Sequence, residues 1–562
     1  MTGDDWTALG NTLWDAEASD KKRMVDCFRK AAYLGSAWGV CNLGICMEQG
    51  NGVEADPVQA FWLYQQAVEM GSLNAVCCLG VCYQYGIGTA PDAEKAAELY
   101  CKAAEYGSPR GQMLLARAFH DGIGVEADAA EAVHWVRAAA YQRYGEGMYR
   151  LGVCYEYGDG VEQNWEHAVH WFREAAESGV SAAMTYLGYC YEKGCGVEQS
   201  WEQAFSWYRR GAECGYPVSM SNLGLCYKRG YGVDQNWQEA IKWYEQGAQC
   251  GDLQSMHNLA CCYERGEGVE QNEERALYWY RRSAEGGNGV AMCNLGWCYQ
   301  RGYGVEQNED RALYWYRRGA EAGSDYCMYC LGWNYSNGEG VEQNMTEAIR
   351  WYTAAAEGGN ADAMHNLGWH YDYGEGVEQD MKKAICWYER AAEQNHPAAM
   401  NSLGECYAMG RGVPRDLETA MEWYRRAAEL GEAMADYNMG WHLEQAGKLS
   451  EAYTHYRKAA DGNDDSAWWA LGRFYENGVV VAQDGKEARR CYETGEKLGS
   501  VKCKMRLARC KLLGIGGHRA KKAGLDLCRQ ALELAKESSE KEDYGYEAEM
   551  NLLRRTIAEN ES

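Results

Sequence analysis

The sequence predicts an all-α protein, an α-solenoid in which about 14 helical hairpins with a 36-residue period follow a right-handed superhelix. One observation behind this prediction is a residue pair, here called the anchor, that returns every 36 positions. Nine anchors are Leu-Gly, two are Leu-Ala and one is Met-Gly, and their first residues are 43, 79, 115, 151, 187, 223, 259, 295, 331, 367, 403 and 439. The other observation is helical spacing of the apolar residues around each anchor. A hairpin of two such helices cannot bury its apolar faces alone, so successive hairpins are expected to stack.

The first helix of each unit, helix A, is centred on the anchor. In the unit 181–216, apolar residues fall four and three positions before Leu187 and three and four positions after it. At 100° per residue these side chains share one arc of about 120°, the pattern of an amphipathic helix. Seven residues after the anchor comes Gly194, a residue type that caps helices in the left-handed conformation. Helix A is therefore expected to end there.

The second helix, helix B, is predicted to begin thirteen residues after the anchor. Each of eleven successive units has a favoured N-cap residue at this position: Asp56, Asp92, Asp128, Asn164, Ser200, Asn236, Asn272, Asn308, Asn344, Asp380 and Asp416. In the unit 181–216, the helix would carry Ala204, Trp207, Tyr208 and Ala212 on one side and end near Gly215. Each unit is thus predicted to be an antiparallel helical hairpin.

The unit also resembles a known family. It reads, with x for variable positions, A-M-x-x-L-G-x-C-Y-x-x-G-x-G-V-E-Q-N-x-x-x-A-x-x-W-Y-x-x-A-A-E-x-G. This pattern resembles the Sel1-like repeat, a longer-looped relative of the tetratricopeptide repeat, and the resemblance covers about 36–517. Members of that family are adaptors that hold other proteins, in bacteria and in eukaryotes. The resemblance therefore implies a non-catalytic interaction scaffold.

Three segments are expected along the chain. Residues 1–35 would form a degenerate first repeat or cap, with a short helix from Trp6 to Trp14, and 36–517 would form the array. Within it, the anchor Leu471-Gly472 follows the preceding one after only 32 residues, which predicts a short loop there. Residues 518–562 would cap the array with two helices, about 519–536 and 544–559, because a solenoid needs polar ends.

Composition limits the partners and the location. The net charge is −26, with 82 acidic and 56 basic residues, which argues against a nucleic-acid partner. No run of 18 apolar residues exists, so no membrane partner is expected. The N-terminus lacks the basic start and apolar core of a secretory signal, which makes cytoplasmic residence the expectation. The chain alone is expected to be monomeric.

The 25 cysteines are expected to be reduced. Nine of them stand three residues after an anchor or its equivalent, a position that faces the core, where a thiol behaves as a small hydrophobe: Cys46, Cys82, Cys154, Cys190, Cys226, Cys262, Cys298, Cys406 and Cys510. Secreted relatives of the family pair a cysteine at the end of helix B with one at the start of the next helix A. The matching positions here include Ala176 with Met184 and Ala212 with Met220, which depart from that pattern.

An aromatic stripe is the main candidate site. Positions two before and two after the anchor lie about 160° from it, where a surface helix should be polar. In the stretch 257–469 they instead hold Trp297, Trp333, Trp369 and Trp441 after the anchor and Tyr329, Tyr437, Trp469, His257 and His365 before it. Helix A lines the concave surface in tetratricopeptide-type arrays, so the resemblance implies a stripe inside a groove. A protein or peptide partner is the expected ligand.

Asparagines stand beside this stripe, one residue before the anchor. They are Asn42, Asn222, Asn258, Asn294, Asn366 and Asn438. An amide both donates and accepts, so this row is expected to bind the backbone of an extended peptide while the rings take its side chains. The alternative is that the rings pack on neighbouring repeats and that each asparagine binds a nearby backbone group.

Two further columns have a structural and a functional interpretation. Lys193, Arg229, Arg265 and Arg301, six residues after the anchor, either clamp an acidic ligand or stabilise the last turn of helix A. His370, Cys406 and His442 are successive three residues after the anchor. Adjacent repeats separate their Cα atoms by about 10 Å, a long reach for one ion, and Cys327 with Cys330 is a lone C-x-x-C. No metal and no cofactor are expected.

Catalytic motifs carry little weight. Ser-x-x-Lys occurs at 19–22 and 538–541, but neither Ser-Asp-Asn nor Lys-Thr-Gly accompanies it. The repeated Gly-x-Gly follows a helix, and no Gly-Lys-Ser or Gly-Lys-Thr occurs. The sequence thus favours a non-enzymatic scaffold, and the alternative is an exported or host-directed binding protein of the same fold.

Overall fold

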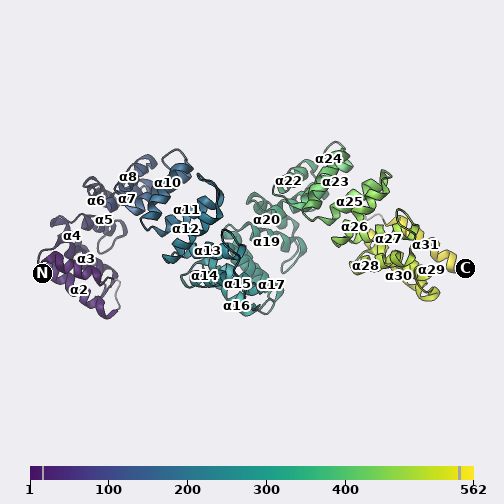
Figure 1. Ribbon diagram of the computed structural model, residues 1–562, viewed down its shortest axis with the longest axis horizontal. Coiled ribbons are helices and arrows are strands. Elements are labelled where there is room, and N and C mark those ends of the chain that lie inside the picture. The colour runs from purple at the N-terminus through teal and green to yellow at the C-terminus, as the bar shows by residue number, and fades with distance from the viewer. Residues whose placement is uncertain (15–17, 542–545, 562) are drawn as a thin grey trace. The chain divides into compact units, whose positions relative to one another are not determined.

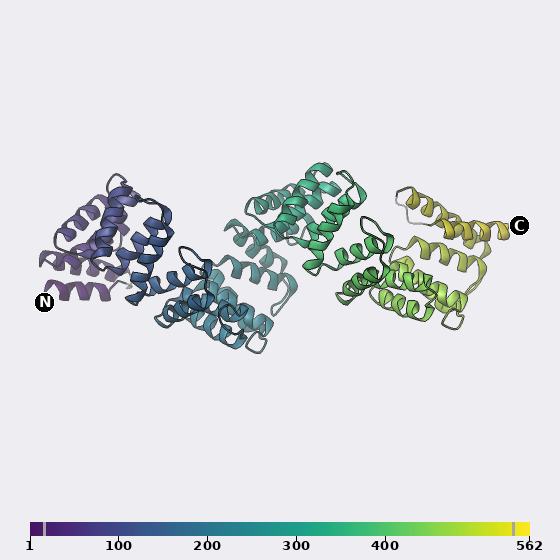
Figure 2. The ribbon, with the colours of Figure 1, turned by 90° about the horizontal axis from the view of Figure 1, so that it is seen from above.

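The computed structural model describes residues 1–14, 18–541 and 546–561, which form 31 α-helices and, over those ranges, no strand (Figure 1). The all-α, paired-helix prediction is confirmed. The chain divides into two compact units, 1–286 and 287–562. Figure 2 shows the same succession of helical pairs from above.

Unit 1 contains sixteen helices over residues 1–14 and 18–286. They are α1 (Gly3–Thr12), α2 (Ala18–Tyr33), α3 (Ala37–Gln49), α4 (Pro57–Glu69), α5 (Leu73–Tyr85), α6 (Ala93–Glu105), α7 (Pro109–Asp121), α8 (Ala129–Tyr141), α9 (Gly145–Tyr157), α10 (Trp165–Glu177), α11 (Ser181–Lys193), α12 (Trp201–Glu213), α13 (Pro217–Arg229), α14 (Trp237–Gln249), α15 (Leu253–Arg265) and α16 (Glu273–Glu285).

Unit 2 contains fifteen helices among its described residues. They are α17 (Gly289–Arg301), α18 (Glu309–Glu321), α19 (Asp325–Asn337), α20 (Met345–Glu357), α21 (Ala361–Tyr373), α22 (Met381–Glu393), α23 (Pro397–Met409), α24 (Leu417–Glu429), α25 (Ala433–Gln445), α26 (Leu449–Asp461), α27 (Asp465–Asn477), α28 (Gly485–Lys497), α29 (Val501–Leu513), α30 (Lys521–Lys541) and α31 (Glu547–Glu561).

The helix boundaries come from local side-chain and backbone chemistry. Helix α11 ends at Gly194, which has a φ of 72°, and the Ser200 side chain accepts a hydrogen bond from the Gln203 amide at the start of α12. All eleven predicted N-cap residues accept such a bond in the structure. The predicted hairpin boundaries are therefore confirmed.

The long loop between helices A and B is closed by its glutamine. Gln199 Nε2 donates to the Glu192 carbonyl oxygen over 2.8 Å, and Gln343 and Gln483 make the same bond in their repeats over 2.9 Å. These bonds satisfy carbonyls that the end of a helix leaves free. Gly196 has a φ of 69°, and a β-carbon on it would lie 2.4 Å from the Trp165 carbonyl oxygen of the preceding helix B. The loop thus packs on the preceding repeat.

The core of most repeats is built on a helix B tyrosine that packs against the anchor glycine, and Val136 and Phe172 take the place of the tyrosine in two repeats. Tyr208 lies on Gly188, and its hydroxyl donates to Glu192 Oε2 over 2.8 Å. Tyr64 and Tyr492 make the equivalent bonds over 2.6 Å and 2.7 Å. The tyrosines at this position are fully buried: Tyr64, Tyr100, Tyr208, Tyr244, Tyr280, Tyr316, Tyr352, Tyr388, Tyr424, Tyr456 and Tyr492. They contribute much of the apolar surface that each hairpin buries.

The chain ends modify this pattern. At the N-terminus, a β-carbon on Gly10 would lie 2.4 Å from Phe28 Cε1, so α1 and α2 pack around a glycine and a ring as the later hairpins do. Helix α30 is longer than expected. Residue 544, where the last helix was expected to begin, lies outside the described residues, and α31 packs on α29 and α30 through Met550 and Leu553.

The short loop after the anchor at 439 is as predicted: α25 ends at Gln445 and α26 begins at Leu449. Over the described ranges, the chain has no helix with both the length and the apolar character that a bilayer crossing requires.

Candidate functional site

The tryptophans two residues after the anchor lie exposed on helices A of unit 2. Trp297 on α17 is 40% exposed, Trp333 on α19 is 44% exposed, and Trp369 on α21 is 37% exposed. Trp441 on α25 is 42% exposed. We call these four side chains the tryptophan face. Large apolar side chains that gather on a surface mark an interaction site more often than isolated ones do.

The rings two residues before the anchor have a different environment. They are half-buried and pack on the core tyrosine of their own repeat: the ring centroids are 6.0 Å apart for Tyr329 and Tyr352 and 5.8 Å apart for His365 and Tyr388. Tyr437 packs on Tyr456, and in unit 1 His257 packs on Tyr280. These rings therefore pack on the core of their repeats, and less of their surface is available to a ligand than in the tryptophan face.

Trp469 is covered by the C-terminal helix. Its Nε1 donates to Glu549 Oε1 of α31 over 3.2 Å. The Arg473 guanidinium and the Lys502 ammonium lie 4.6 Å and 5.2 Å from its ring centroids. The Glu549 carboxylate also pairs with Arg506, over 2.6 Å to Nε and 2.7 Å to an Nη. A helix of the same chain thus occupies this part of the surface.

The asparagines make contacts within the chain. Asn438 Nδ2 donates to Asn401 Oδ1 over 3.0 Å and to Glu405 Oε1 over 3.2 Å, and Asn258 accepts from Gln254 over 3.1 Å. In unit 1, Asn42 donates to Asn11 over 2.8 Å, and in the two units Asn222, Asn294 and Asn366 are half-buried. Asn42 and Asn438 therefore hold neighbouring helices in place, and of the six asparagines Asn294, Asn366 and Asn438 belong to unit 2, which carries the tryptophan face.

Asn401 and Asn438 illustrate a register that recurs in the array. The side chain two residues before one anchor meets the side chain one residue before the next anchor, 37 residues later. Ser402 Oγ lies 3.4 Å from His365 Nε2 in the same two positions. We call two residues in these positions a facing pair. Facing pairs join consecutive helices A.

In the repeat between those of Trp369 and Trp441, the position two residues after the anchor holds Glu405 in place of a tryptophan. Its carboxylate accepts from Asn401 and Asn438, both over 3.2 Å, and burial raises its pKa. The nearby Arg411 pairs mainly with Asp372, over 2.9 Å, and lies 3.8 Å from Glu405. Two carboxylates thus share one guanidinium, which leaves net negative charge beside the aromatic rings.

A second exposed apolar column, five residues before the anchor, escaped the sequence analysis. It contains Val290, Tyr326 and Met434 in unit 2. A residue in this column lies seven residues, or two helical turns, before a member of the tryptophan face, so both share one side of helix A. The seven-residue spacing was the signal that could have found it.

Unit 1 presents a smaller version of this surface. Its helices A expose Tyr189 and Leu225 two residues after the anchor and Val218 five residues before one. No tryptophan stands two residues after an anchor in this unit. The predicted residues His257, Asn258 and Asn222 belong to unit 1, and the predicted aromatic rings other than His257 belong to unit 2. The tryptophan face is therefore a feature of unit 2.

The other predicted columns are engaged in local contacts. His370 is buried, with its Nδ1 3.0 Å from the Glu375 carbonyl oxygen, and His442 stacks on Tyr424. Lys193 pairs with Glu192 over 2.9 Å, as expected for a cation in the last turn of a helix. The side chains at 19 and 538–541, which belong to the Ser-x-x-Lys matches, lie outside the described residues.

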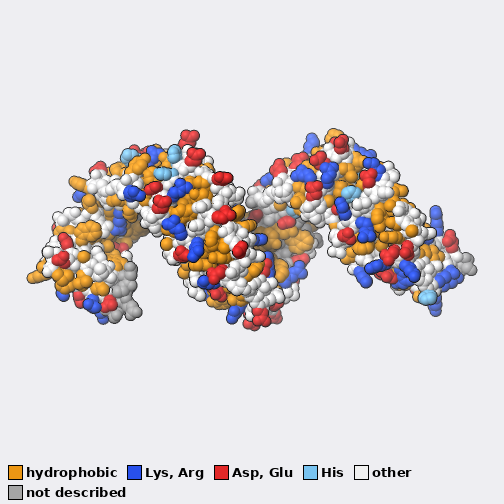
Figure 3. Space-filling view, viewed as in Figure 1, with side chains coloured by type: hydrophobic (Ala, Val, Ile, Leu, Met, Phe, Trp, Pro, Cys, Tyr) orange, Lys and Arg blue, Asp and Glu red, His pale blue; other side chains and the backbone are white. Residues whose placement is uncertain are grey.

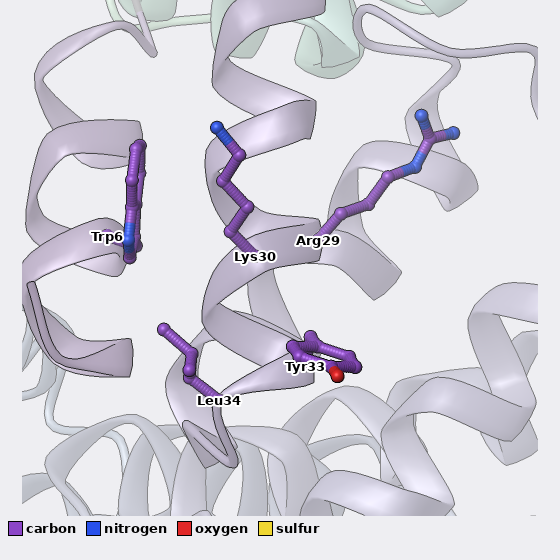
Figure 4. A pocket seen from close by; sticks show the side chains of 5 residues that line it. All are labelled: Trp6, Arg29, Lys30, Tyr33 and Leu34. Carbon is purple, nitrogen blue, oxygen red and sulfur yellow. The ribbon is translucent and has the colours of Figure 1, made fainter.

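A small pocket of about 290 Å³ lies at the start of unit 1 (Figure 4). Trp6 forms one wall, α2 supplies Arg29, Lys30 and Tyr33, and Leu34 follows directly after α2. The Lys30 ammonium lies 4.3 Å from the Trp6 ring centroid and covers it. This cation–π contact accounts for the arrangement without a ligand.

Charges are mixed over the surface. Figure 3 shows acidic and basic groups side by side among apolar patches on the face in view. No large field of one sign is visible on that face, so the apolar patches are its distinguishing feature.

Paired helices, a fixed period and an exposed aromatic column define a helical-repeat protein of the kind that mediates protein–protein interactions. The chain belongs to the Sel1 repeat family, as the resemblance implied. The family model matches residues 39–72, 75–108, 109–144, 145–180, 181–216, 217–252, 253–288, 289–324, 325–360, 361–396, 397–432, 433–464 and 467–500. Proteins of this family are typically non-catalytic scaffolds.

Two solved structures are similar in sequence. The chain is 32% identical to c5321, a protective antigen present in uropathogenic Escherichia coli strains, with a TM-score of 0.51 over 80% of this chain and 97% of that one. It is 33% identical to a Sel1 repeat protein from Oxalobacter formigenes, with a TM-score of 0.40 over 43% of this chain and 96% of that one. No curated protein matches this sequence.

Proposed function

We propose that the protein is a non-catalytic adaptor that binds a peptide segment of a partner protein on the tryptophan face. The observation that carries this proposal is the exposure of Trp297, Trp333 and Trp369 at one position of three successive repeats. Indole rings bury much apolar area with little loss of side-chain freedom, and they are enriched where binding energy concentrates. The half-buried rings and asparagines before the anchors would frame the groove.

The spacing of the tryptophan rings predicts how apolar side chains should be spaced in the bound peptide. Adjacent helices A are about 10 Å apart, and an extended peptide advances about 3.3 Å per residue, so every third residue would meet a tryptophan. The half-buried carboxylate of Glu405 favours a basic residue at the corresponding point of the peptide. The expected ligand is thus an extended segment with apolar side chains at every third position and a Lys or Arg near its end.

The C-terminal helix supports this proposal from within the chain. Helix α31 covers Trp469, which stands two residues before the anchor at 471, and it pairs with Arg506, which stands one residue before the next. These are the positions that border the tryptophan face in earlier repeats. A surface that holds a segment of its own chain in this register has the chemistry to hold a partner's segment.

The experiment compares three proteins for binding of twelve-residue peptides selected from a random library. Wild type should select peptides with the predicted spacing, and the double variant Trp333→Ala/Trp369→Ala should lose binding by at least tenfold. The matched control is Trp38→Ala/Trp62→Ala, which removes two exposed tryptophans elsewhere. Unchanged binding by the first double variant, or a collapse of its thermal stability, would contradict the proposal.

A second candidate function places the same binding surface outside the producing cell, as an exported or host-directed protein. The observation that favours it is the 32% identity to c5321, a protective antigen present in uropathogenic Escherichia coli strains. The cytoplasmic expectation and this alternative are separated by fractionation of the native source. Recovery of the protein in the extracellular fraction, with cell-lysis markers absent from it, would favour export.

A further inference from the structure

Two cysteines form a facing pair on the helices that carry the first two tryptophans. Cys293 on α17 stands two residues before its anchor, and Cys330 on α19 stands one residue before the next. Their Sγ atoms lie 3.5 Å apart. Cys293 is buried, and Cys330 is half-buried, so Cys330 is the more exposed residue of the pair.

A second pair has the same register in unit 1. Cys41 on α3 and Cys78 on α5 are also 37 residues apart, and they are hydrogen-bonded to each other. The Arg110 guanidinium lies 3.7 Å from Cys78 Sγ. The hydrogen bond from Cys41, with help from this cation, lowers the pKa of Cys78 to about 7. The register thus brings two thiols together in each unit.

We propose that Cys293 and Cys330 are a redox-active pair that closes to a disulfide between consecutive repeats when a peroxide oxidises it. The Cys330 thiolate attacks hydrogen peroxide, which gives a sulfenic acid and hydroxide, and the hydroxide takes up a proton to become water. The Cys293 thiol then attacks the Cys330 sulfur, the S–S bond forms, and the sulfenic oxygen leaves as a second water. Two thiols lose two electrons in all, and one peroxide gains them.

The geometry requires only a small movement. A disulfide has an S–S length of about 2.05 Å, so the two sulfurs must approach by roughly 1.5 Å. Helices α17 and α19 already pack together. A third thiol, Cys327 on α19, is also hydrogen-bonded to Cys293, but it is buried in the core and donates to the Gly289 carbonyl oxygen over 3.5 Å. Cys330 is therefore the more exposed of the two thiols that contact Cys293.

The bond would act on the tryptophan face, and this part of the inference rests on the proposed function. Cys293 precedes Trp297 by four residues, and Cys330 precedes Trp333 by three, so each thiol lies one helical turn from an exposed indole. A disulfide at this point would fix the distance between the two rings. Oxidation would thereby select peptides that fit one spacing.

The test uses the full-length chain, treated with hydrogen peroxide and digested with chymotrypsin without reduction. This protease cleaves after Tyr329 and Trp297, which separates Cys330 from Cys327 and Cys293 from Cys298. Mass spectrometry should find the Cys293 and Cys330 peptides linked, and dithiothreitol should release them. The link should be lost in Cys330→Ser and retained in the matched variant Cys327→Ser. The midpoint of thermal unfolding should rise on oxidation in wild type and in Cys327→Ser, but not in Cys330→Ser.

Absence of the link at a peroxide concentration that oxidises Cys330, or a link from Cys293 to Cys327 instead, would overturn the proposal. Peptide binding is measured on the same samples. If the link forms and the affinity for the selected peptides does not change, the disulfide stands and its control of ring spacing is wrong. Since Cys330→Ser should bind peptide as reduced wild type does, failure of the redox inference is distinguishable from failure of the proposed function.

Discussion

The ring of Tyr208 lies where a side chain on Gly188 would have to go. A β-carbon on Gly188 would be 2.6 Å from Tyr208 Cε1, closer than any two carbon atoms can pack. The same clash recurs at other anchors: 2.5 Å between Gly224 and Tyr244, and 2.5 Å between Gly404 and Tyr424. The glycine of the anchor is thus favoured because a ring from the other helix of the hairpin packs directly on it.

Gly188→Ala is expected to lower the free energy of unfolding by about 1–3 kcal/mol because the added methyl group overpacks the hairpin. Ala260, with Tyr280 at the ring position, shows that a repeat can adapt to a methyl group here, which favours the lower part of that range. Chemical denaturation of both proteins measures the difference. In the repeat 109–144, Ala116 is accompanied by Val136, so Gly188→Ala/Tyr208→Val should lose less than the two single changes combined. A strictly additive double variant would contradict the contact.

Tyr208→Phe should cost about 0.5–1.5 kcal/mol because it removes the hydrogen bond to Glu192. The chain supplies its own control in Tyr244, whose hydroxyl is buried without a hydrogen-bond partner among the described residues. Removing an unpaired buried hydroxyl is expected to be neutral or stabilising, so Tyr244→Phe should have no cost. The comparison is made by equilibrium denaturation, and equal losses in the two variants would show that the bond to Glu192 contributes nothing.

Trp333→Ala and Leu331→Ala should differ in their effect on the free energy of unfolding, because one residue lies on the surface of α19 and the other in the core. Leu331 is fully buried on α19, and its truncation should cost about 2–5 kcal/mol. Trp333 is 44% exposed, so its truncation should cost no more than about 1 kcal/mol. Thermal unfolding of the two variants tests this directly. A loss for Trp333→Ala as large as that for Leu331→Ala would mean that the ring is part of the core.

His365 should make the protein less stable in acid. Burial, helped by the nearby His396, lowers the pKa of His365 to about 4 from its ordinary value of 6.5. Between those values the unfolded chain binds a proton that the folded chain does not, so the free energy of unfolding falls as the pH falls through this window. Other groups also titrate there, so the measured quantity is the difference in pH slope between wild type and His365→Gln. The free energy of unfolding of His365→Gln should fall less steeply as the pH falls.

His120→Gln is the control for that measurement. A hydrogen bond with Asp121 raises the pKa of His120, so its contribution is present at low pH and is lost as the pH rises through its folded pKa. His120 is exposed, and salt screens its pair, so the effect should be small and opposite in sign. Identical slopes for wild type and His365→Gln would contradict the assignment.

Glu549→Ala should release the C-terminal helix. The change removes the carboxylate that binds Arg506 and Trp469. Arg506 keeps its pair with Glu476 over 3.3 Å, so the loss of stability should be smaller than the about 3–5 kcal/mol that an unpaired buried charge costs. Hydrogen exchange measured by mass spectrometry should show lost protection in 547–561, with little change in the repeats before α27. Glu547→Ala, an exposed position on the same helix, is the matched control. Unchanged exchange in Glu549→Ala would show that apolar packing alone holds α31.

The repeat architecture was readable from the sequence because its signals are local and repeated. An N-cap such as Ser200 acts within three residues of itself, and Gly194 acts within one turn, so a period of such residues defines helix boundaries. The reason for the anchor glycine was not readable in the same way. It depends on the approach of Tyr208 across the hairpin, and the spacing of residues along one helix does not specify that approach.

The candidate site was readable only in part. A helical wheel places the positions of Tyr329 and Trp333 equally far from the anchor, yet the first ring packs on a core tyrosine while the second is exposed. The difference comes from Tyr352 of helix B, which lies against Tyr329. The contact between Trp469 and Glu549 spans 80 residues and has no periodic signal, so it required the folded chain.

The facing pairs make the repeats that carry them depend on the identity of the next repeat. Asn401 is matched to Asn438, His365 to Ser402 and Cys293 to Cys330. A 36-residue repeat moved to another place in the array would keep one residue of each facing pair and lose contact with the other. Shuffling repeats should therefore yield chains that fold less well than the original order, even though the pieces look alike.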